Sequence, residues 1–208
     1  MIDLLPGDPV RRGRIKLLAL AAFFALPVLA GYVVYFFGWV PGAAANYGTL
    51  IPARPLSDVI LQGADQRPLK FSELRGKWLL VQFDRGACDA YCERKLYFMR
   101  QVRRALGKDM ARVERLWLLT DGAPPKAGLL EAFEGTRTAR PESQAFEREF
   151  PVDGATGGAV GGTAAGTAAD HIYLVDPHGN LMLRFPRNPD PSRMLKDMQR
   201  LLKASQIG

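Results

Sequence analysis

The sequence predicts an α/β domain, with a central mixed sheet flanked by helices, attached to one N-terminal transmembrane helix. Three observations support this fold class. Residues 17–40 contain no charged side chain, residues 78–84 and 113–121 contain apolar runs of strand length, and residues 89–106 and 190–205 carry apolar side chains at helical spacing. Buried strands that alternate with amphipathic helices are typical of α/β proteins.

The uncharged segment 17–40 would rise about 36 Å as a helix, which is enough to cross a hydrocarbon core of about 30 Å. A cleaved signal peptide is the alternative, since residues 42–46 (GAAAN) resemble a cleavage site. Signal peptides, however, have shorter apolar regions of about 7–15 residues. By the positive-inside rule, the N-terminus stays in the cytoplasm because of the basic side chains that precede the segment, which are Arg11, Arg12, Arg14 and Lys16.

We therefore expect a single-pass protein of a bacterial inner membrane, with its C-terminal domain in the periplasm. A linker should join the two parts, because residues 46–55 (NYGTLIPARP) contain two prolines and lead away from the membrane segment. The expected parts are a cytoplasmic N-terminus at 1–16, the transmembrane helix at 17–40, the linker at 41–54 and the periplasmic domain at 55–208.

The charge of the chain does not indicate a nucleic-acid partner. The net charge is +7, but the basic residues are spread along the domain, and residues 100–115 are their densest stretch. We interpret that stretch as a solvated helix face, with anionic lipid or an acidic partner protein as alternative contacts. The sequence has no Gly-rich phosphate loop and no HExxH zinc motif, so we expect no nucleotide either.

The order of elements within the domain predicts a thioredoxin-like arrangement. Two short strands precede residue 78, and the apolar runs with the intervening helix then form a βαβ core. Residues 129–150 look mixed, with short helices at best, and residues 154–169 are rich in Gly, Ala and Thr, which predicts a mobile loop. Residues 171–186 read as a hairpin with its turn at 176–179, and a terminal helix follows.

The only two cysteines, Cys88 and Cys92, lie where the first central strand passes into the first long helix. Residues four apart at a helix start share a face, with Cα atoms about 6 Å apart, which suits a disulfide or two thiolates on one metal ion. A helix N-terminus also stabilises a thiolate. A purely structural disulfide would stabilise little across so short a loop. Redox exchange and metal binding therefore remain as alternatives.

The histidines favour the metal alternative. His178 lies in the predicted hairpin turn and is expected to be exposed, whereas His171 follows Asp170 and opens the strand after the Gly/Ala loop. Two thiolates and one imidazole suit copper in either oxidation state, so Cys88, Cys92 and His171 are the predicted ligands of one copper ion. Redox proteins of this fold mostly have two residues between their cysteines rather than three.

The same residues resemble the Sco (SenC) family of membrane-anchored copper chaperones for cytochrome c oxidase. The C-x3-C pair, the distal Asp170-His171 and the hairpin IYLVDPHGNLMLRF match the family, and FSELRGKWLLVQF resembles its approach to the site. The likeness covers roughly residues 55–205. It implies a thioredoxin-like domain, a copper cargo, and an oxidase subunit or another assembly factor as partner.

The sequence departs from the family pattern around the cysteines. Family members usually carry proline after the first cysteine and often around the second, where this chain has Asp89 and Glu93. The lead-in to the first cysteine is FDRGA instead of the family's aromatic and threonine-containing sequence. The acidic side chains oppose a low thiolate pKa but favour the capture of a cation.

Three functions are compatible with these residues. In the first, a copper-binding assembly factor passes its ion to an oxidase subunit by ligand exchange, and the loop before His171 lets that ligand swing away. In the second, a thiol–disulfide oxidoreductase uses Cys88 as attacking and Cys92 as resolving thiol to reduce the oxidase copper site or another Sco protein. In the third, a scaffold holds oxidase subunits without chemistry. A metallochaperone is favoured over an enzyme.

Overall fold

The structure of the protein is a computed structural model that describes residues 9–36, 46–63, 67–152, 166–205 and 207. The chain divides into two compact units, and each is described by itself. The units are Met1–Ala45 and Asn46–Gly208.

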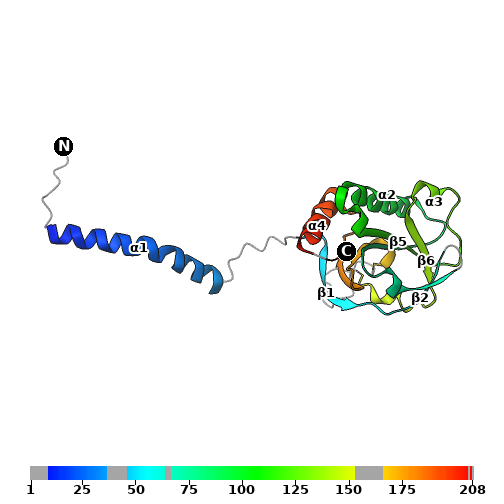
Figure 1. Ribbon diagram of the computed structural model, residues 1–208, viewed down its shortest axis with the longest axis horizontal. Helices are drawn as coiled ribbons and strands as arrows, with labels where there is room; N and C mark the ends of the chain where they lie inside the picture. Colours follow the sequence, from blue (N-terminus) through cyan, green and yellow to red (C-terminus); the bar gives the residue numbers. More distant parts are fainter. Residues whose placement is uncertain (1–8, 37–45, 64–66, 153–165, 206, 208) are drawn as a thin grey trace. The chain divides into compact units, whose positions relative to one another are not determined.

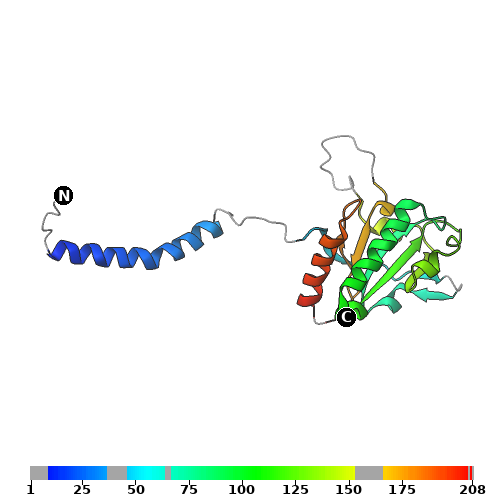
Figure 2. The ribbon, with the colours of Figure 1, turned by 90° about the horizontal axis from the view of Figure 1, so that it is seen from above.

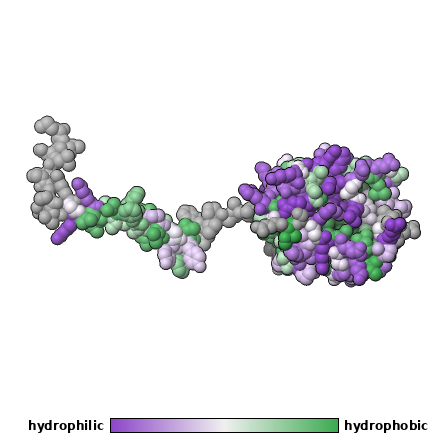
Figure 3. Space-filling view, viewed as in Figure 1, coloured by the Kyte–Doolittle hydropathy of each residue, from purple (hydrophilic) through white to green (hydrophobic). Residues whose placement is uncertain are grey.

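The first unit contains helix α1 (Pro9–Phe36), which includes Pro27. Its part Gly13–Phe36 is long and apolar enough to cross a membrane. The side chains described on this helix are exposed. Figure 3 shows that they are mostly hydrophobic, whereas the surface of the second unit is more hydrophilic. The helix therefore fits a single-pass membrane anchor. Residues 37–40 of the expected transmembrane segment lie outside the described residues.

The second unit is built on one eight-stranded sheet with the strand order β1-β8-β7-β4-β5-β6-β2-β3. The pairs β4·β5 and β5·β6 are parallel and the other pairs are antiparallel, so the sheet is mixed. The strands are β1 (Thr49–Pro55), β2 (Ile60–Gly63), β3 (Pro68–Lys70), β4 (Trp78–Asp84), β5 (Val113–Leu119), β6 (Thr136–Pro141), β7 (Ile172–Val175) and β8 (Asn180–Arg184).

The predicted α/β fold, a central sheet flanked by helices, is confirmed. Helices α2 (Ala90–Ala105) and α4 (Pro191–Ala204) lie side by side against the sheet (Figures 1 and 2). The short helices, which complete the unit, are α3 (Leu129–Ala132), η1 (Phe71–Leu74), η2 (Gly107–Arg112), η3 (Glu147–Glu149) and η4 (Ala168–Asp170).

Strand alternation sends side chains into two cores, one on each face of the sheet. The first core packs β4 and β5 against α2 and α4, and both cysteines belong to it. The second core contains a set of aromatic side chains in edge-on contact, which are Phe71, Phe83, Phe146, Phe150 and Tyr173. Because both faces are buried, β4 carries the near-continuous apolar run WLLVQF.

Two strands form where the sequence alone did not indicate them. Residues 49–55, most of which were expected as linker, form β1 at the sheet edge and pair with β8, with an irregular register between Leu50 and Arg54. Prolines are tolerated there because an edge strand leaves one row of N–H groups unpaired. Residues 136–141 form β6, whose sequence TRTARP has no apolar alternation but whose backbone pairs with β5 and β2.

Candidate functional site

The turn between β4 and α2 presents the first cysteine. The backbone N–H of Cys88 donates to the carbonyl of Arg85 at 3.1 Å, and Cys88 has a φ of 40°, in the left-handed region. Asp89 then caps α2, since its carboxylate accepts from the backbone N–H groups of Tyr91 and Cys92 at 2.9 Å each. Asp89, which stands where the sequence departs from the Sco pattern, is therefore the N-cap of the cysteine helix.

The same turn is pressed against the loop that follows β5. A Cβ atom on Gly86 would lie 2.3 Å from the carbonyl oxygen of Ala123, so only glycine fits. The N–H of Gly86 donates to the Asp121 carboxylate at 3.0 Å, and its carbonyl accepts from the N–H of Lys126 at 2.9 Å. Backbone packing thus holds the turn in place.

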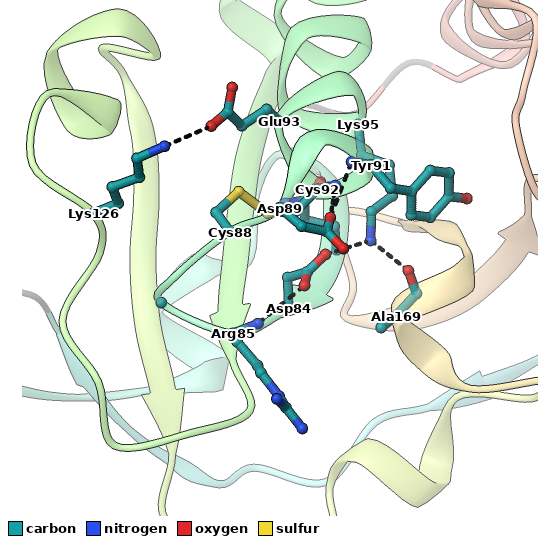
Figure 4. Close-up of a disulfide and its surroundings, with 12 residues drawn as sticks. Asp84, Arg85, Cys88, Asp89, Tyr91, Cys92, Glu93, Lys95, Lys126 and Ala169 are labelled. Carbon is teal, nitrogen blue, oxygen red and sulfur yellow. Dashed lines mark hydrogen bonds and ion pairs between the residues drawn. A yellow bond between two sulfur atoms is a disulfide. The ribbon is translucent and has the colours of Figure 1, made fainter.

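Cys88 and Cys92 form a disulfide with Cα atoms 5.2 Å apart. Both cysteines are buried, at 3% and 0% exposure, within the core under α2. Figure 4 shows the bond at the first turn of the helix, below the exposed ion pair of Glu93 and Lys126. Such a bond can accept two electrons, and its sulfurs become available as metal ligands only after reduction, because the thiolate is the ligand.

Gln82, on strand β4, contacts the disulfide and was missed by sequence reasoning. Its side chain is fully buried in the middle of the sheet, and its amide Nε2 donates to the sulfur of Cys92 at 3.6 Å. The sequence predicts β4 from its apolar run, and the one signal for a functional side chain there was the single amide residue within that run. An N–H donor at a sulfur favours the thiolate form of that sulfur.

Lys95 was also missed, because a lysine on a helix is ordinarily solvated. Its side chain is only 1% exposed, and its ammonium lies 3.0 Å from the carboxylate of Asp84 at the end of β4. It also donates to the carbonyls of Phe83, at 3.2 Å, and Ala169 (Figure 4). Burial lowers the pKa of Lys95 below its usual value, and the negative charge of Asp84 offsets part of that effect.

His171 follows η4 and is completely buried. Its Nδ1 lies 2.9 Å from the carbonyl oxygen of Phe185. Because a carbonyl only accepts, Nδ1 carries the proton in this contact, and in the neutral ring Nε2 is the nitrogen with a lone pair. The ring also packs edge-on to Tyr173, with centroids 6.0 Å apart.

Asp170 beside it is held by Thr167 and Arg187. It accepts from the N–H of Thr167 at 2.8 Å and pairs with Arg187 at 3.2 Å. Burial would raise the pKa of Asp170, but these hydrogen bonds and the Arg187 charge outweigh it and lower the pKa overall. The carboxylate is therefore ionised at neutral pH, and it forms the acidic part of the capping box of η4, whose N-cap is Thr167.

The structure brings the two cysteines together, as the C-x3-C spacing predicts. Within the part of the chain that the structure describes, no three His, Cys, Asp or Glu side chains form a group that could hold a metal ion. The copper site of Cys88, Cys92 and His171 therefore stays a prediction for the reduced protein. His178 is exposed in the turn before β8, as expected. Most of the Gly/Ala loop, residues 153–165, lies outside the described residues.

Comparisons with known proteins place this geometry in a family. Residues 78–205 match the family described as the transmembrane-like, thioredoxin-like, C-terminal domain, while none of the curated proteins matches the chain. Copper-bound Sco1 from yeast is similar in structure, with a TM-score of 0.57 and 16% identity over 73% of this chain and 91% of that one.

Two further solved structures are similar at comparable levels. Apo Sco1 from Thermus thermophilus has a TM-score of 0.54 and 20% identity, covering 75% of this chain and 96% of that one. BsSco, described with a disulfide switch and as a member of the Sco family of cytochrome c oxidase assembly proteins, has a TM-score of 0.51 and 16% identity, covering 74% and 96%.

The likeness to Sco structures that the sequence predicted is thus confirmed as a likeness of fold. The match over residues 78–205 covers more than half of the chain and includes the β4–α2 junction, the β7–β8 hairpin and α4. The chain belongs to the transmembrane-like, thioredoxin-like family, and its domain has the fold seen in Sco1 proteins.

Proposed function

We propose that this protein is a membrane-anchored, periplasm-facing copper-binding factor that matures the copper site of cytochrome c oxidase. In the proposed role Cys88, Cys92 and His171 hold one copper ion as cargo. The observation that carries the proposal is the attachment of the His171 segment to the cysteine helix: the hydroxyl of Tyr91, next to Cys92, donates to the carbonyl of Asp170, next to His171, at 2.7 Å.

The donor atoms suit the cargo once the disulfide is reduced. A dithiol donor would break the S–S bond, supply two electrons and two protons, and leave as its own disulfide. Cys88 and Cys92 would then offer soft thiolates, and copper binding would release their protons. The Nδ1 contact of His171 with the Phe185 carbonyl fixes the tautomer whose lone pair is on Nε2, the arrangement found in most metal-ligating histidines.

Location and partner follow from the same proposal. Helix α1 would anchor the chain in a bacterial inner membrane with its N-terminus in the cytoplasm, because basic residues precede the apolar segment. The partner would be a cytochrome c oxidase subunit or another assembly factor. The printed descriptions of yeast Sco1, with copper bound, and BsSco, an oxidase assembly protein, support this role by analogy of fold.

Copper titration of the reduced full-length protein in detergent tests the ligand set. We expect one copper ion per chain, loss of binding when both cysteines are replaced by serine, and affinity at least about tenfold weaker for His171→Ala. His178→Ala is the matched control, because that histidine is exposed in a turn. If His171→Ala binds copper with the same affinity and spectrum as the parent, the three-ligand site is wrong.

Thiol–disulfide exchange is the second candidate, and the contact of Gln82 with the sulfur of Cys92 favours it. An amide donor stabilises the thiolate of the reduced pair, which makes the disulfide a better oxidant. Cys88 would attack and Cys92 would resolve. A Cys92→Ser variant should then accumulate a mixed disulfide with its client through Cys88. A pair that exchanges with neither a client peptide nor glutathione would exclude this role.

A further inference from the structure

Lys95 is enclosed by acceptors from two separate parts of the chain. An ammonium group has three N–H donors, and three acceptors surround this one: Asp84 and the Phe83 carbonyl at the end of β4, and the carbonyl of Ala169 in η4. A buried charge is tolerated only when it is paired and hydrogen-bonded. The ammonium is therefore saturated, and it bridges the strand that leads to the cysteines and the segment that leads to His171.

Tyr91 makes the neighbouring link from the same face of α2, one helical turn earlier. Its hydroxyl donates to the Asp170 carbonyl at 2.7 Å and accepts from the N–H of Asn188 at 3.3 Å. Its ring lies 5.1 Å from the Lys95 ammonium, in cation–π contact. Two side chains of the cysteine helix thus bind two successive carbonyls, at residues 169 and 170, directly before His171.

We propose that Lys95, together with Tyr91, is a positioning residue that fastens residues 167–171 to the cysteine helix and thereby sets where His171 lies relative to Cys88 and Cys92. Its consequence for copper rests on the proposed function. The fastening itself does not, because it concerns contacts within the copper-free chain. Cys92 lies between the two fastening residues in sequence, so the cysteine and both links belong to the first two turns of α2.

The alternative is that Lys95 only neutralises Asp84. A pair serving that purpose alone would need no acceptor outside β4, yet the ammonium also donates to a carbonyl 74 residues away along the chain. Because this donor is charged, the bond is stronger than one between neutral groups. The contact with η4 is therefore a structural link in its own right.

Hydrogen exchange of the full-length protein in lipid nanodiscs tests the fastening without copper. The reporters are the N–H of Asp170, which donates to Thr167 at 3.0 Å, and the N–H of His171, which donates to Ala168 at 3.3 Å. Loss of a charge-assisted bond should speed exchange in residues 167–171 by about tenfold in Lys95→Met, with β5 amides unchanged. Lys126→Met is the matched control, since Lys126 is an exposed lysine paired with α2.

Tyr91→Phe is the second variant, because it removes one hydroxyl and keeps the shape of the ring. We expect exchange in the same segment to rise several-fold, also without a change in β5. If Lys95→Met or Tyr91→Phe leaves exchange in residues 167–171 within about twofold of the parent, the positioning role is overturned. A Lys95→Met variant that fails to fold would leave Tyr91→Phe to decide.

Electron paramagnetic resonance of the reduced, Cu(II)-loaded chain links the positioning to the ligand. We expect nitrogen hyperfine coupling in the parent, its loss in His171→Ala, and its weakening in Lys95→Met but not in Lys126→Met. Unchanged coupling in His171→Ala would sink the three-ligand proposal, while the exchange experiment would still decide the role of Lys95. Coupling lost in His171→Ala but intact in Lys95→Met would overturn the link between Lys95 and the ligand.

Discussion

The turn that carries Cys88 and the segment that carries His171 meet the same helix, but different forces hold them. The cysteine turn is held by backbone contacts, since Gly86 packs directly onto the carbonyl of Ala123. The histidine segment is attached to that helix by the tips of two long side chains, Tyr91 and Lys95. Close backbone packing leaves a single arrangement, whereas side-chain hydrogen bonds can be released and remade. One half of the proposed site is therefore rigid and the other adjustable.

The largest expected effect comes from filling the backbone contact. Gly86→Ala places a Cβ 2.3 Å from a carbonyl oxygen, and we expect about 3 kcal/mol lower free energy of unfolding. Denaturant unfolding of the full-length protein in detergent measures this. Gly107→Ala, which has a φ of 58° but open space around its Cβ, should cost only about 1 kcal/mol. Equal costs for the two variants would contradict the packing argument.

Removing the charge opposite Lys95 should have the next largest effect. Asp84→Asn leaves a buried ammonium without its counter-charge, and we expect a loss of about 2 kcal/mol at neutral pH. The exposed pair of Glu93 and Lys126 provides the control, because Glu93→Gln should change the free energy of unfolding by less than about 0.5 kcal/mol.

The loss in free energy of unfolding caused by Asp84→Asn, called the deficit below, should depend on pH. Burial holds the folded-state pKa of Lys95 below its unfolded value of 10.5. Between these two values the unfolded chain binds more protons, so the contribution of this lysine to the free energy of unfolding rises with pH. The deficit of Asp84→Asn should shrink as the pH is raised toward 10.5. A deficit that grows with pH would show that the ammonium is not the group affected.

In the rigid half of the proposed site, Gln82→Leu should mainly change the reduction potential of the disulfide. Loss of the N–H donor removes stabilisation of the reduced Cys92 sulfur, and we expect the reduction potential to fall by about 30 mV. Equilibration with glutathione buffers measures this potential. Gln62→Leu, at an exposed amide that bonds Glu142, should leave it unchanged. A rise in potential for Gln82→Leu would mean that the amide stabilises the disulfide instead.

The smallest effect is expected in the capping box of η4. Asp170→Asn removes the charge that Thr167 and Arg187 bind, at a cost of about 1 kcal/mol at neutral pH. Because the folded-state pKa of Asp170 lies below 3.8, this stability is present above that pH and is lost as the pH falls through the folded value. Parent and variant should therefore unfold equally easily in strong acid. A difference that persists at low pH would assign the effect to packing.

Local sequence patterns were sufficient to predict an element wherever its own residues show which of its faces is buried. The apolar run of β4, the helical stripe of α2, the turn at Gly179 and the amphipathic α4 were all expected from periodicity and turn chemistry. Strand β6 was not, because TRTARP has no alternation and its place depends on pairing with β5 and β2. Its backbone hydrogen bonds, rather than its side chains, define it as a strand.

The sequence by itself determined the apolar N-terminal segment, the α/β class and the position of the C-x3-C pair at a strand-to-helix junction, because each is a property of neighbouring residues. Only the tertiary structure decided that Lys95 and Gln82 are buried beside that pair, and that the His171 segment is bound to the cysteine helix. The physical reason is distance along the chain: these contacts join residues that become neighbours only when the sheet orders its strands.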